Sequence, residues 1–453
     1  MGRRSLLCLS LAHLLLAGCG PERSIAPGIT LNGPAPTNVL FLSVDTLRHD
    51  VIGRYSGGEE SPFLDSLLAS GVALDDLTAC STWTGSTFPC LFNGASGSDL
   101  GLHGQLGDIG GSIPDDFRWG IRRFTARGYA SGLVNANHIF NTGLGGFEAS
   151  FHDVVSGTME ASSVTDAALV MAEDLDQAGA PWLLAVHYFD PHTPLTPPQS
   201  YLGGLEDLAP SPADVTAGWL DYSGEWEGWS QDLRDAFLAE VWLRYRAEVR
   251  YFDDQVQRLW EELDALGILD DTLVVLWADH GEQFGEHRGW NHAQTVHVEE
   301  RAVLGGLWAR TLVPGAWTGP TTQTDLLPTA LAILGIDPYD EADSSEPEIT
   351  GFVLGEAPAD RIRLTTLAKE NANDLPSAAI SAERGSRVLI YDGVGNVELY
   401  DRAADPREAT DLFDAATSGA DPEVQALWQA IRAEGQTLID AGLARPGQVP
   451  PGL

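Results

Sequence analysis

The sequence predicts an α/β fold, with a large mixed and mostly parallel sheet flanked by helices and a small C-terminal α+β subdomain. Short apolar runs alternate with stretches of helical periodicity, which is the order of β-α-β units in a parallel sheet. The runs are Val39–Val44, Gly132–Val134, Trp182–Val186 and Leu273–Trp277. Before the last run, Phe252, Val256, Leu259, Leu263 and Leu266 recur at helical spacing and predict a helix with a core-facing stripe.

The C-terminal part shows an antiparallel pattern. Arg387–Tyr391 and Val397–Tyr400 predict two strands joined by a glycine-containing turn, and a helix is expected over residues 423 to 441. We place the boundary in the acidic stretch 337–347, so that residues 38–340 form the large domain and 341–453 the subdomain. Two units agree with a length beyond what one hydrophobic core usually serves.

The N-terminus has the pattern of an export signal over residues 1–19. Arg3-Arg4 precede an apolar run, which ends in Leu16-Ala-Gly-Cys19. This tetrapeptide resembles the lipobox of bacterial lipoproteins, which implies cleavage before Cys19 and a membrane anchor through a lipid on its thiol. A neutral residue after Cys19 indicates the outer membrane of a Gram-negative cell envelope, facing either the periplasm or the surface. A secretory signal without lipid is the alternative.

Residues 20–37 are rich in Pro and Gly and predict a tether. No later apolar run approaches the roughly 20 residues that a membrane helix needs. The chain carries 65 acidic and 26 basic residues, a formal net charge of −39, and Lys369 is its one lysine. This balance argues against nucleic acid, whose phosphates require a basic surface. We interpret the charge as a solvated acidic face.

Two acidic motifs stand where predicted strands end. Asp45 follows the run Val39–Val44, and Asp279-His280 follow Leu273–Trp277. Ligands and metals gather at the carboxyl ends of parallel strands. We therefore expect these side chains to contribute to one metal site.

A series of motifs, in order along the chain, resembles the sulfatase branch of the alkaline phosphatase superfamily. They are the strand ending in Asp45, Ser61-Pro-Phe-Leu-Asp65, Asp190-Pro-His-Thr-Pro194, Asp279-His280-Gly281-Glu282, Asp325-Leu-Leu-Pro-Thr329, and Glu398-Leu-Tyr-Asp401 with Asp405-Pro406. The resemblance covers nearly all of the chain after the signal. It implies a catalytic domain over residues 38–340 and a metal-dependent hydrolase that acts on an anionic ester.

The resemblance also points to a nucleophile. In that family it lies ten residues before a glycine that closes its helix, and counting back from Gly94 gives Thr84. Neither Cys80 nor Cys90 begins the Cys-x-Pro-x-Arg motif of formylglycine sulfatases. The family's threonine enzymes imply one divalent ion held by Asp45, Thr84, Asp279 and His280. These three oxygens and one nitrogen suit Mn²⁺, Zn²⁺ or Ca²⁺. A helix cap is the alternative role for Thr84.

Histidines supply the remaining catalytic candidates. His192 and His292 fall where family members contact the anion or protonate the leaving group, which suits a group that titrates near neutrality. His138 keeps the last position of the family's Gly-Lys-Trp-His, here Asn135-Ala-Asn-His138, with a loop hydrogen bond as its alternative role. The other histidines considered, His187, His287, His297 and His103, are assigned structural roles.

Departures from the family favour a phosphate ester. The family's two sulfate-binding lysines are missing, and Thr46 stands where its calcium site has a second aspartate. The resemblance thus implies hydrolysis of a phosphate mono- or diester, or phospho-group transfer, through a covalent Thr84 ester. A sulfate ester hydrolase without formylglycine is one alternative, and an inactive binding module of the cell envelope is another.

Four further points stay open from the sequence. Cys80 and Cys90 bracket Thr84 and form either a disulfide or two free thiols. Asp190 with His192 and His292 is an alternative second metal site. Arg48 either pairs with Asp50 or reaches an anion. The insertion Pro198–Asp235, with Trp219, Trp226 and Trp229, either packs on the domain or contacts substrate or lipid.

Overall fold

The computed structural model describes residues 23–100, 102, 113, 117–142, 144–215, 226, 228–340, 348–371, 375–415 and 417–440. The export signal with Cys19, the residues 20–22, His103, Trp219 and the stretch 341–347 lie outside the described residues. The lipid anchor therefore stays a prediction. Within the described part, no helix has both the length and the apolar character needed to span a membrane.

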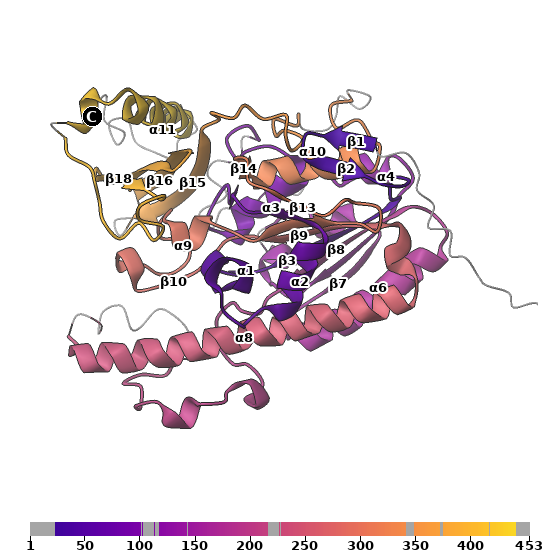
Figure 1. Cartoon of the computed structure of the whole chain (residues 1–453), viewed down its shortest axis with the longest axis horizontal. Coiled ribbons are helices and arrows are strands. Elements are labelled where there is room, and N and C mark those ends of the chain that lie inside the picture. The colour runs from indigo at the N-terminus through magenta and orange to yellow at the C-terminus, as the bar shows by residue number, and fades with distance from the viewer. Residues whose placement is uncertain are drawn as a thin grey trace, which may run out of the picture.

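An eight-stranded sheet forms the centre of the large domain (Figure 1), with the order β13-β4-β12-β9-β3-β8-β6-β7. Its middle holds the four predicted strands side by side and parallel: β9 (Thr272–Ala278), β3 (Asn38–Val44), β8 (Trp182–Tyr188) and β6 (Ala130–Asn135). The other members are β4 (Val72–Leu74), β7 (Asp153–Ser156), β12 (Gly305–Trp308) and β13 (Gly315–Trp317). Because β12 runs antiparallel to β9 and β4, the sheet is mixed, and the predicted fold class is confirmed.

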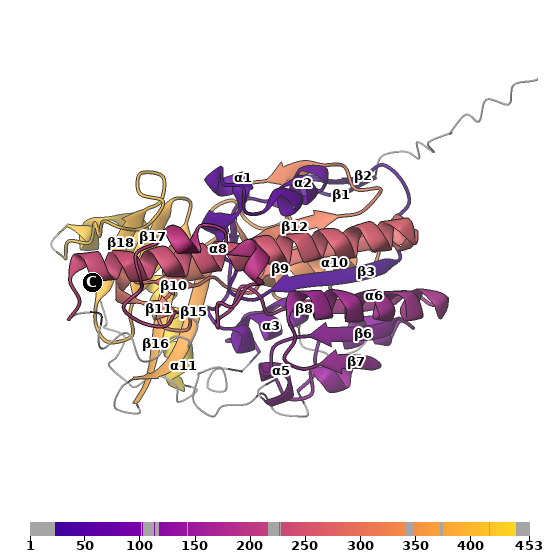
Figure 2. The same ribbon diagram turned by 90° about the horizontal axis from the view of Figure 1, so that it is seen from below.

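Helices cover both faces of this sheet (Figures 1 and 2), which explains why every residue of β3, β8 and β9 is buried. On one face lie α2 (Pro62–Ser70), α6 (Ala161–Gln177) and the long α8 (Gln231–Ala265); on the other lie α3 (Thr84–Asn93) and α10 (Leu326–Ile333). The predicted apolar stripe lies in α8, except that Leu266 is 52% exposed. That residue was wrongly assigned to the core because the helix ends at Ala265.

Several short elements connect these layers. The short helices are α1 (Gly53–Ser56), α4 (Arg122–Thr125), α5 (Ile139–Thr142) and α9 (Val298–Arg301). The short strands are β5 (Leu77–Thr78) with β14 (Thr321–Thr322), and β10 (Gln283–Phe284) with β11 (Trp290–Asn291). The β10–β11 hairpin leads directly to His292, so it places a candidate catalytic residue.

The predicted tether is wrong for residues 23–31. β1 (Arg23–Ala26) and β2 (Ile29–Leu31) form an antiparallel hairpin, in which Ile29 and Leu31 are fully buried. Leu31 also bridges to Leu312 of the large domain. The Pro- and Gly-rich composition obscured the alternation of buried and exposed side chains in these short strands. Burial of Ile29 and Leu31 holds the hairpin against the large domain.

The C-terminal subdomain is a four-stranded antiparallel sheet with one helix. Its strands are β15 (Arg363–Asn371), β16 (Leu375–Arg384), β17 (Arg387–Tyr391) and β18 (Val397–Asp401), followed by α11 (Pro422–Asp440). The predicted strands and helix are confirmed, whereas β15 and β16 were not predicted. The predicted boundary was too early, because Ile349 and Leu354 still pack in the large domain's core.

One face of the subdomain's sheet packs against the large domain. Val388, Ile390 and Tyr400 join Val296 in a buried cluster, and Trp83 and Ala293 are packed against it. Trp83 immediately precedes Thr84, and Ala293 immediately follows His292. The subdomain therefore supports two of the segments that carry candidate catalytic residues.

Candidate active site at the carboxyl edge of the sheet

Two fully buried carboxylates meet where β3 and β9 end, as the sequence predicts. Asp279 Oδ1 accepts hydrogen bonds from the backbone N–H groups of Thr46 at 3.1 Å and His280 at 2.7 Å. Asp45 Oδ2 accepts one from Asn137 Nδ2 at 2.7 Å. Asp45 Oδ1 is buried and has no hydrogen-bond partner within the described part of the chain. That orphaned oxygen is the kind of group that a cation satisfies.

Thr84 is the first residue of α3 and faces these carboxylates. Its hydroxyl donates to Asp279 Oδ2 at 2.8 Å and lies 3.3 Å from His280 Nε2. The residue at the helix cap is Trp83, and it makes no side-chain capping bond. The hydroxyl of Thr84 is therefore directed at the acidic site rather than at its own helix, and the four predicted metal-binding residues lie together.

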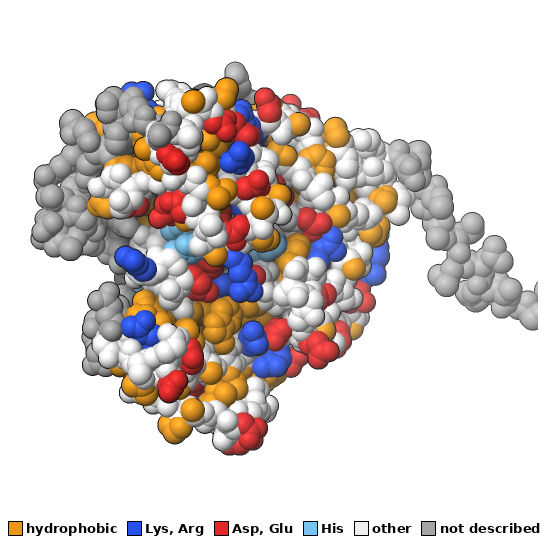
Figure 3. Space-filling model, turned by 60° about the vertical axis from the view of Figure 1, so that its left-hand side comes forward, with side chains coloured by type: hydrophobic (Ala, Val, Ile, Leu, Met, Phe, Trp, Pro, Cys, Tyr) orange, Lys and Arg blue, Asp and Glu red, His pale blue; other side chains and the backbone are white. Residues whose placement is uncertain are grey.

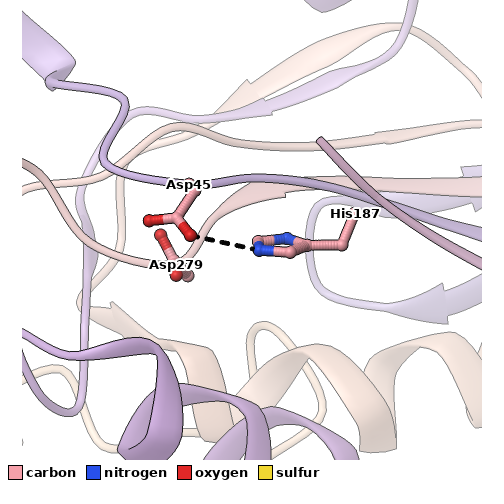
Figure 4. A group of neighbouring side chains, drawn as sticks. All are labelled: Asp45, His187 and Asp279. Carbon is pink, nitrogen blue, oxygen red and sulfur yellow. Dashed lines mark hydrogen bonds and ion pairs between the residues drawn. The ribbon is translucent and has the colours of Figure 1, made fainter. Parts of the chain in front are cut away.

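His187 lies beside Asp45, a place that the sequence reasoning missed by assigning the residue a structural role. Its Nδ1 lies 2.9 Å from the Ser43 hydroxyl, and its Nε2 lies 3.3 Å from Asp45 Oδ2 (Figure 4). Asp45, His187 and Asp279 are close enough together to hold one ion. The pairing of the strands could have indicated this position. His187 is a polar residue in the otherwise apolar strand β8, and in the parallel pairing with β3 it lies opposite Ser43.

The electrostatics of the pair favour a bound cation. Burial and the neighbouring Asp45 together hold the pKa of Asp279 well above its usual range. Burial also acts to raise the pKa of Asp45, but the charges of His192, His187 and His280 bring it below its usual range. Two buried carboxylates in contact are costly without a positive charge between them. Carboxylate, imidazole and hydroxyl ligands fit a divalent ion, as expected for this family, without fixing its identity.

His192 and His292 lie next to the candidate metal-binding residues. The ring of His292 is 4.6 Å from that of His280 and 5.0 Å from that of His192, measured between centroids. His292 Nδ1 lies 3.2 Å from Glu282 Oε1. Burial lowers the pKa of His292, but Glu282, Asp45 and Glu300 together more than offset this and raise it to about 9. The His292 side chain keeps 16% exposure, and Figure 3 shows histidines reaching the surface in the middle of one face.

His138 lies three residues after the end of β6, and its catalytic role stays a prediction. Its side chain is exposed, whereas Asn137 is 5% exposed and bonds Asp45. The family pattern places His138 at a catalytic position, and the structure shows that the residue before it points inward to Asp45. Asn137 is thus a site residue that the sequence reasoning missed.

Several loop residues of the site have left-handed backbone. Thr46 has φ 51°, Asn291 has φ 62° and Ala293 has φ 58°. Such conformations are unfavourable for residues other than glycine and are concentrated at functional sites. Here they flank Asp45 and His292, so the surrounding contacts fix the direction of both side chains.

The structure resolves the pairing of Cys80 and Cys90, which form a disulfide with Cα atoms 6.7 Å apart. The bond closes the segment that contains Thr84. Gln323 adds a second link, because its Oε1 accepts from the Cys80 N–H at 3.1 Å and its Nε2 donates to the Asp279 carbonyl at 2.6 Å. No sequence pattern indicated this role for Gln323, which ties the segment that contains Thr84 to the end of β9.

The other open points also have answers. Arg48 is 2% exposed and pairs with Asp50 and Glu286, which confirms its structural role. Among the described residues, the group close enough to hold an ion is Asp45, His187 and Asp279, so Asp190 does not complete a second metal site with His192 and His292. From the insertion, Trp226 and Trp229 pack on Phe237 and Trp290, as the packing alternative predicts. Ring centroids are 4.9 Å apart for Trp226 and Trp290 and 5.3 Å apart for Trp229 and Phe237.

Comparison with known proteins decides the family, since a model named Sulfatase matches residues 37–336. The chain belongs to the sulfatase family. It is 26% identical to a choline-sulfatase of Rhizobium meliloti, over 58% of this chain and 52% of that protein. It is 21% identical to an N-acetylglucosamine-6-O-sulfatase of Bacteroides thetaiotaomicron, over 91% and 88%. A human iduronate 2-sulfatase is 31% identical, but over only 28% of its own length.

Solved structures share the fold of this sulfatase-family protein. One, described in complex with its substrate D-glucosamine-2-N,6-O-disulfate, matches with a TM-score of 0.68 and 18% identity, over 90% of this chain and 99% of that one. The phosphonate monoester hydrolase of Agrobacterium radiobacter matches with a TM-score of 0.64 and 17% identity, over 89% and 95%. The curated relatives named above are sulfatases, and the solved structures that share the fold include a phosphonate monoester hydrolase.

Proposed function

We propose that this sulfatase-family protein hydrolyses phosphate mono- or diesters through a covalent ester on Thr84. The observation that carries the proposal is the hydrogen bond from the Thr84 hydroxyl to Asp279 at the edge of the candidate metal site. The nearby Cys80 and Cys90 are bonded to each other, so neither offers a thiol for conversion to formylglycine. A threonine at the nucleophile position then has to react as a hydroxyl.

The chain's own residues account for the proton transfers. Asp279 takes the proton of Thr84 as its oxygen attacks phosphorus, and the ester bond to the leaving alcohol breaks. His192 or His292 gives that alcohol its proton and then takes one from the water that attacks the Thr84 ester. Release of phosphate returns the proton of Asp279 to Thr84. A divalent ion held by Asp45, Thr84, Asp279 and His280, with His187 beside them, would lower the pKa of the hydroxyl and neutralise charge on the transferred group.

The choice of phosphate over sulfate rests on what surrounds the site. The large domain, residues 38–340, contains no lysine, so it lacks the two that hold sulfate in lysine-dependent members. Histidines stand near the site instead, and these can serve as proton donors to a phosphate ester's leaving group. Transfer of the phospho-group to an acceptor alcohol instead of water uses the same first step.

A sulfate ester is the second candidate, favoured by the names of the relatives. The experiment that separates the two measures initial rates of protein lacking residues 1–19 on p-nitrophenyl phosphate, bis-p-nitrophenyl phosphate and p-nitrophenyl sulfate, each with Mn²⁺, Zn²⁺ and Ca²⁺. Preference for either phosphate supports the proposal, whereas preference for sulfate replaces it. No turnover of any ester, together with no effect of metal on thermal stability, would support the binding module.

The export signal and the lipobox support a place in the cell envelope, with a membrane anchor through the lipid on Cys19. Growth with a radiolabelled fatty acid tests this, because the full-length chain should incorporate label and Cys19→Ala should not. Fractionation then distinguishes the outer membrane from the soluble periplasm. A full-length protein that is soluble and carries no label would indicate a secretory signal without lipid attachment.

A further inference from the structure

An open pocket lies between α3 and the C-terminal subdomain. The Cys80–Cys90 disulfide lines it from the large domain, and residues of β15 and α11 line it from the subdomain. The pocket encloses about 510 Å³, including solvent at its mouth. Of the described residues that line it, none belongs to the candidate metal site. It is therefore a second concave site, separate from the candidate active site.

The subdomain side of the pocket follows from the alternation of side chains along β15. Leu364, Thr366 and Ala368 share one face of the strand and line the pocket, whereas Leu367 on the opposite face is buried. The Thr366 N–H donates to the Cys80 carbonyl at 2.9 Å. This backbone bond joins the strand to the large domain beside the disulfide, so the two sides of the pocket are held to each other.

Ser81 is an unsatisfied polar residue in the wall of the pocket. It lines the pocket and is 2% exposed, and its Oγ has no hydrogen-bond partner within the described part of the chain. A buried hydroxyl without a partner destabilises the fold, and most buried polar groups have one. A ligand in the pocket would provide the missing partner.

Glu434 gives the pocket its charge. Its Oε1 accepts hydrogen bonds from the Ser98 hydroxyl and, at 3.2 Å, from the Thr366 hydroxyl, so residues of both domains fix the carboxylate. None of the described lining residues is a lysine, arginine or histidine. The pocket therefore presents a carboxylate without a positive charge, which disfavours phosphate, sulfate and other anions.

These groups define the chemistry of a ligand. An ammonium group pairs with a carboxylate such as that of Glu434 in a charge-assisted hydrogen bond. A hydroxyl group both donates and accepts, so it satisfies the Ser81 Oγ in either direction. Leu364 and Leu438 add apolar wall, and apolar walls with a few placed polar groups are typical of small-molecule sites.

We propose that this pocket binds a small amine that also carries hydroxyl groups, with the ammonium at Glu434 and a hydroxyl at Ser81. The ligand would lie against the disulfide that encloses Thr84 and against the subdomain at the same time. Its binding should therefore stabilise the contact between the two domains. The proposal does not depend on the proposed function, because binding is measured without turnover.

The first test compares three probes by calorimetry and by melting temperature, with the protein lacking residues 1–19. Glucosamine carries an ammonium and hydroxyl groups, glucose lacks the ammonium, and cyclohexylamine lacks the hydroxyls. Glucosamine should bind and raise Tm, and each of the other two should bind more weakly by about tenfold or more. Absence of glucosamine binding, or equal affinity for all three probes, would overturn the proposal.

The second test locates the site. Glu434→Gln and Ser81→Ala should each weaken glucosamine binding by about tenfold or more. The control is Glu423→Gln, a glutamate near the start of α11 that lies outside the pocket, and it should bind like wild type. Wild-type affinity in both pocket variants would place the ligand elsewhere and overturn the proposal.

Melting of the ligand-free variants separates a binding role from a structural one. Ser81→Ala removes a hydroxyl without a partner, so its Tm should equal or exceed that of wild type. This result also shows that the variant folds. A clearly lower Tm would mean that the hydroxyl already has a partner in the folded chain, and it would contradict the proposed contact.

Discussion

The hydroxyl of Thr84 donates a 2.8 Å hydrogen bond to the carboxylate of Asp279, which lies 195 residues further along the chain. If this hydroxyl is the nucleophile, Thr84→Ala should lower kcat by about 10³-fold or more, because no other group can form the covalent intermediate. Thr84→Ser keeps a hydroxyl and is the matched control, with measurable turnover expected. The measurement is the initial rate of each variant on the p-nitrophenyl ester that the wild type hydrolyses fastest. Thr84→Ala with wild-type turnover would contradict the assignment.

Metal binding should stabilise the folded chain, because an ion between Asp45 and Asp279 relieves the repulsion of two buried carboxylates. At a concentration of 100 times Kd, a ligand adds about 2.7 kcal/mol to the free energy of unfolding. We expect Mn²⁺, Zn²⁺ or Ca²⁺ to raise the Tm of protein treated with a chelator. Asp45→Asn should abolish the rise, and His187→Ala should weaken it, whereas His152→Ala should leave it unchanged. An equal rise in Asp45→Asn would place the ion elsewhere.

The roles of His192 and His292 can be separated by the leaving group. A poor leaving group needs a proton more than p-nitrophenolate does. Loss of the proton donor should therefore slow hydrolysis of an alkyl phosphate by about 10²–10⁴-fold and that of the p-nitrophenyl ester much less. Comparing both rates in His192→Ala and His292→Ala identifies the donor. His152→Ala is the control, since that side chain is exposed and bonds Ser131. Equal losses on both substrates would indicate anion binding instead of proton donation.

The Cys80–Cys90 disulfide should matter for stability and for turnover. Breaking a native disulfide typically costs about 2–4 kcal/mol of stability. Cys80→Ser with Cys90→Ser should lower the free energy of unfolding in urea by this order and should also lower kcat, because the bond encloses Thr84. Cys90→Ser alone also removes the disulfide and leaves Cys80 as a free thiol, so its stability and kcat should match those of the double variant. Unchanged kcat would show that α3 and Gln323 position Thr84 without the bond.

The meeting of Asp45 and Asp279 could be predicted because the sequence marks the ends of strands. Asp45 and Asp279 each follow an apolar run, and the parallel neighbours β3 and β9 bring them together. His187 and Asn137 could not be predicted in the same way, because their approach to Asp45 depends on the register of β8 and on the bend after β6. A single apolar run in the sequence determines neither the register of a strand nor the path of the chain that follows it. The family pattern that gives His138 likewise fixes a position along the chain and not the direction of a side chain.

Some of the fold was concealed by composition. The hairpin of β1 and β2 lies in a Pro- and Gly-rich stretch, where two buried side chains outweigh the local preference for loop. The subdomain boundary was placed in an acidic stretch, yet Leu354 N–H donates to the Thr329 hydroxyl at 3.0 Å and keeps the following segment on the large domain. Both errors have one cause, because contacts between distant segments override local composition.

The contact between the two domains predicts a response to acid. Glu383 is 1% exposed and bonds Arg363 at 2.7 Å, Arg402 at a short distance and Arg301 at 3.5 Å. Burial acts to raise the pKa of Glu383, but these three arginines lower it from 4.5 to about 2. The folded state therefore binds this proton less tightly than the unfolded chain. The resulting stabilisation is present above about pH 4.5 and is lost as pH falls toward about 2.

Glu383→Gln should accordingly lower stability at pH 7 by about 1–3 kcal/mol, because it removes one counter-charge from three arginines. The loss is limited because Arg301 keeps its pair with Glu408, and Arg363 and Arg402 keep theirs with Asp76. The variant's stability should also change less than the wild type's between pH 4.5 and pH 2. Glu423→Gln is the control, since that glutamate is 39% exposed where it pairs with Arg387, and exposed pairs contribute about 0–1 kcal/mol. Urea unfolding at several pH values, followed by tryptophan fluorescence, measures both. A loss no larger than that of Glu423→Gln would mean that apolar packing alone holds the subdomain against the segments that carry Thr84 and His292.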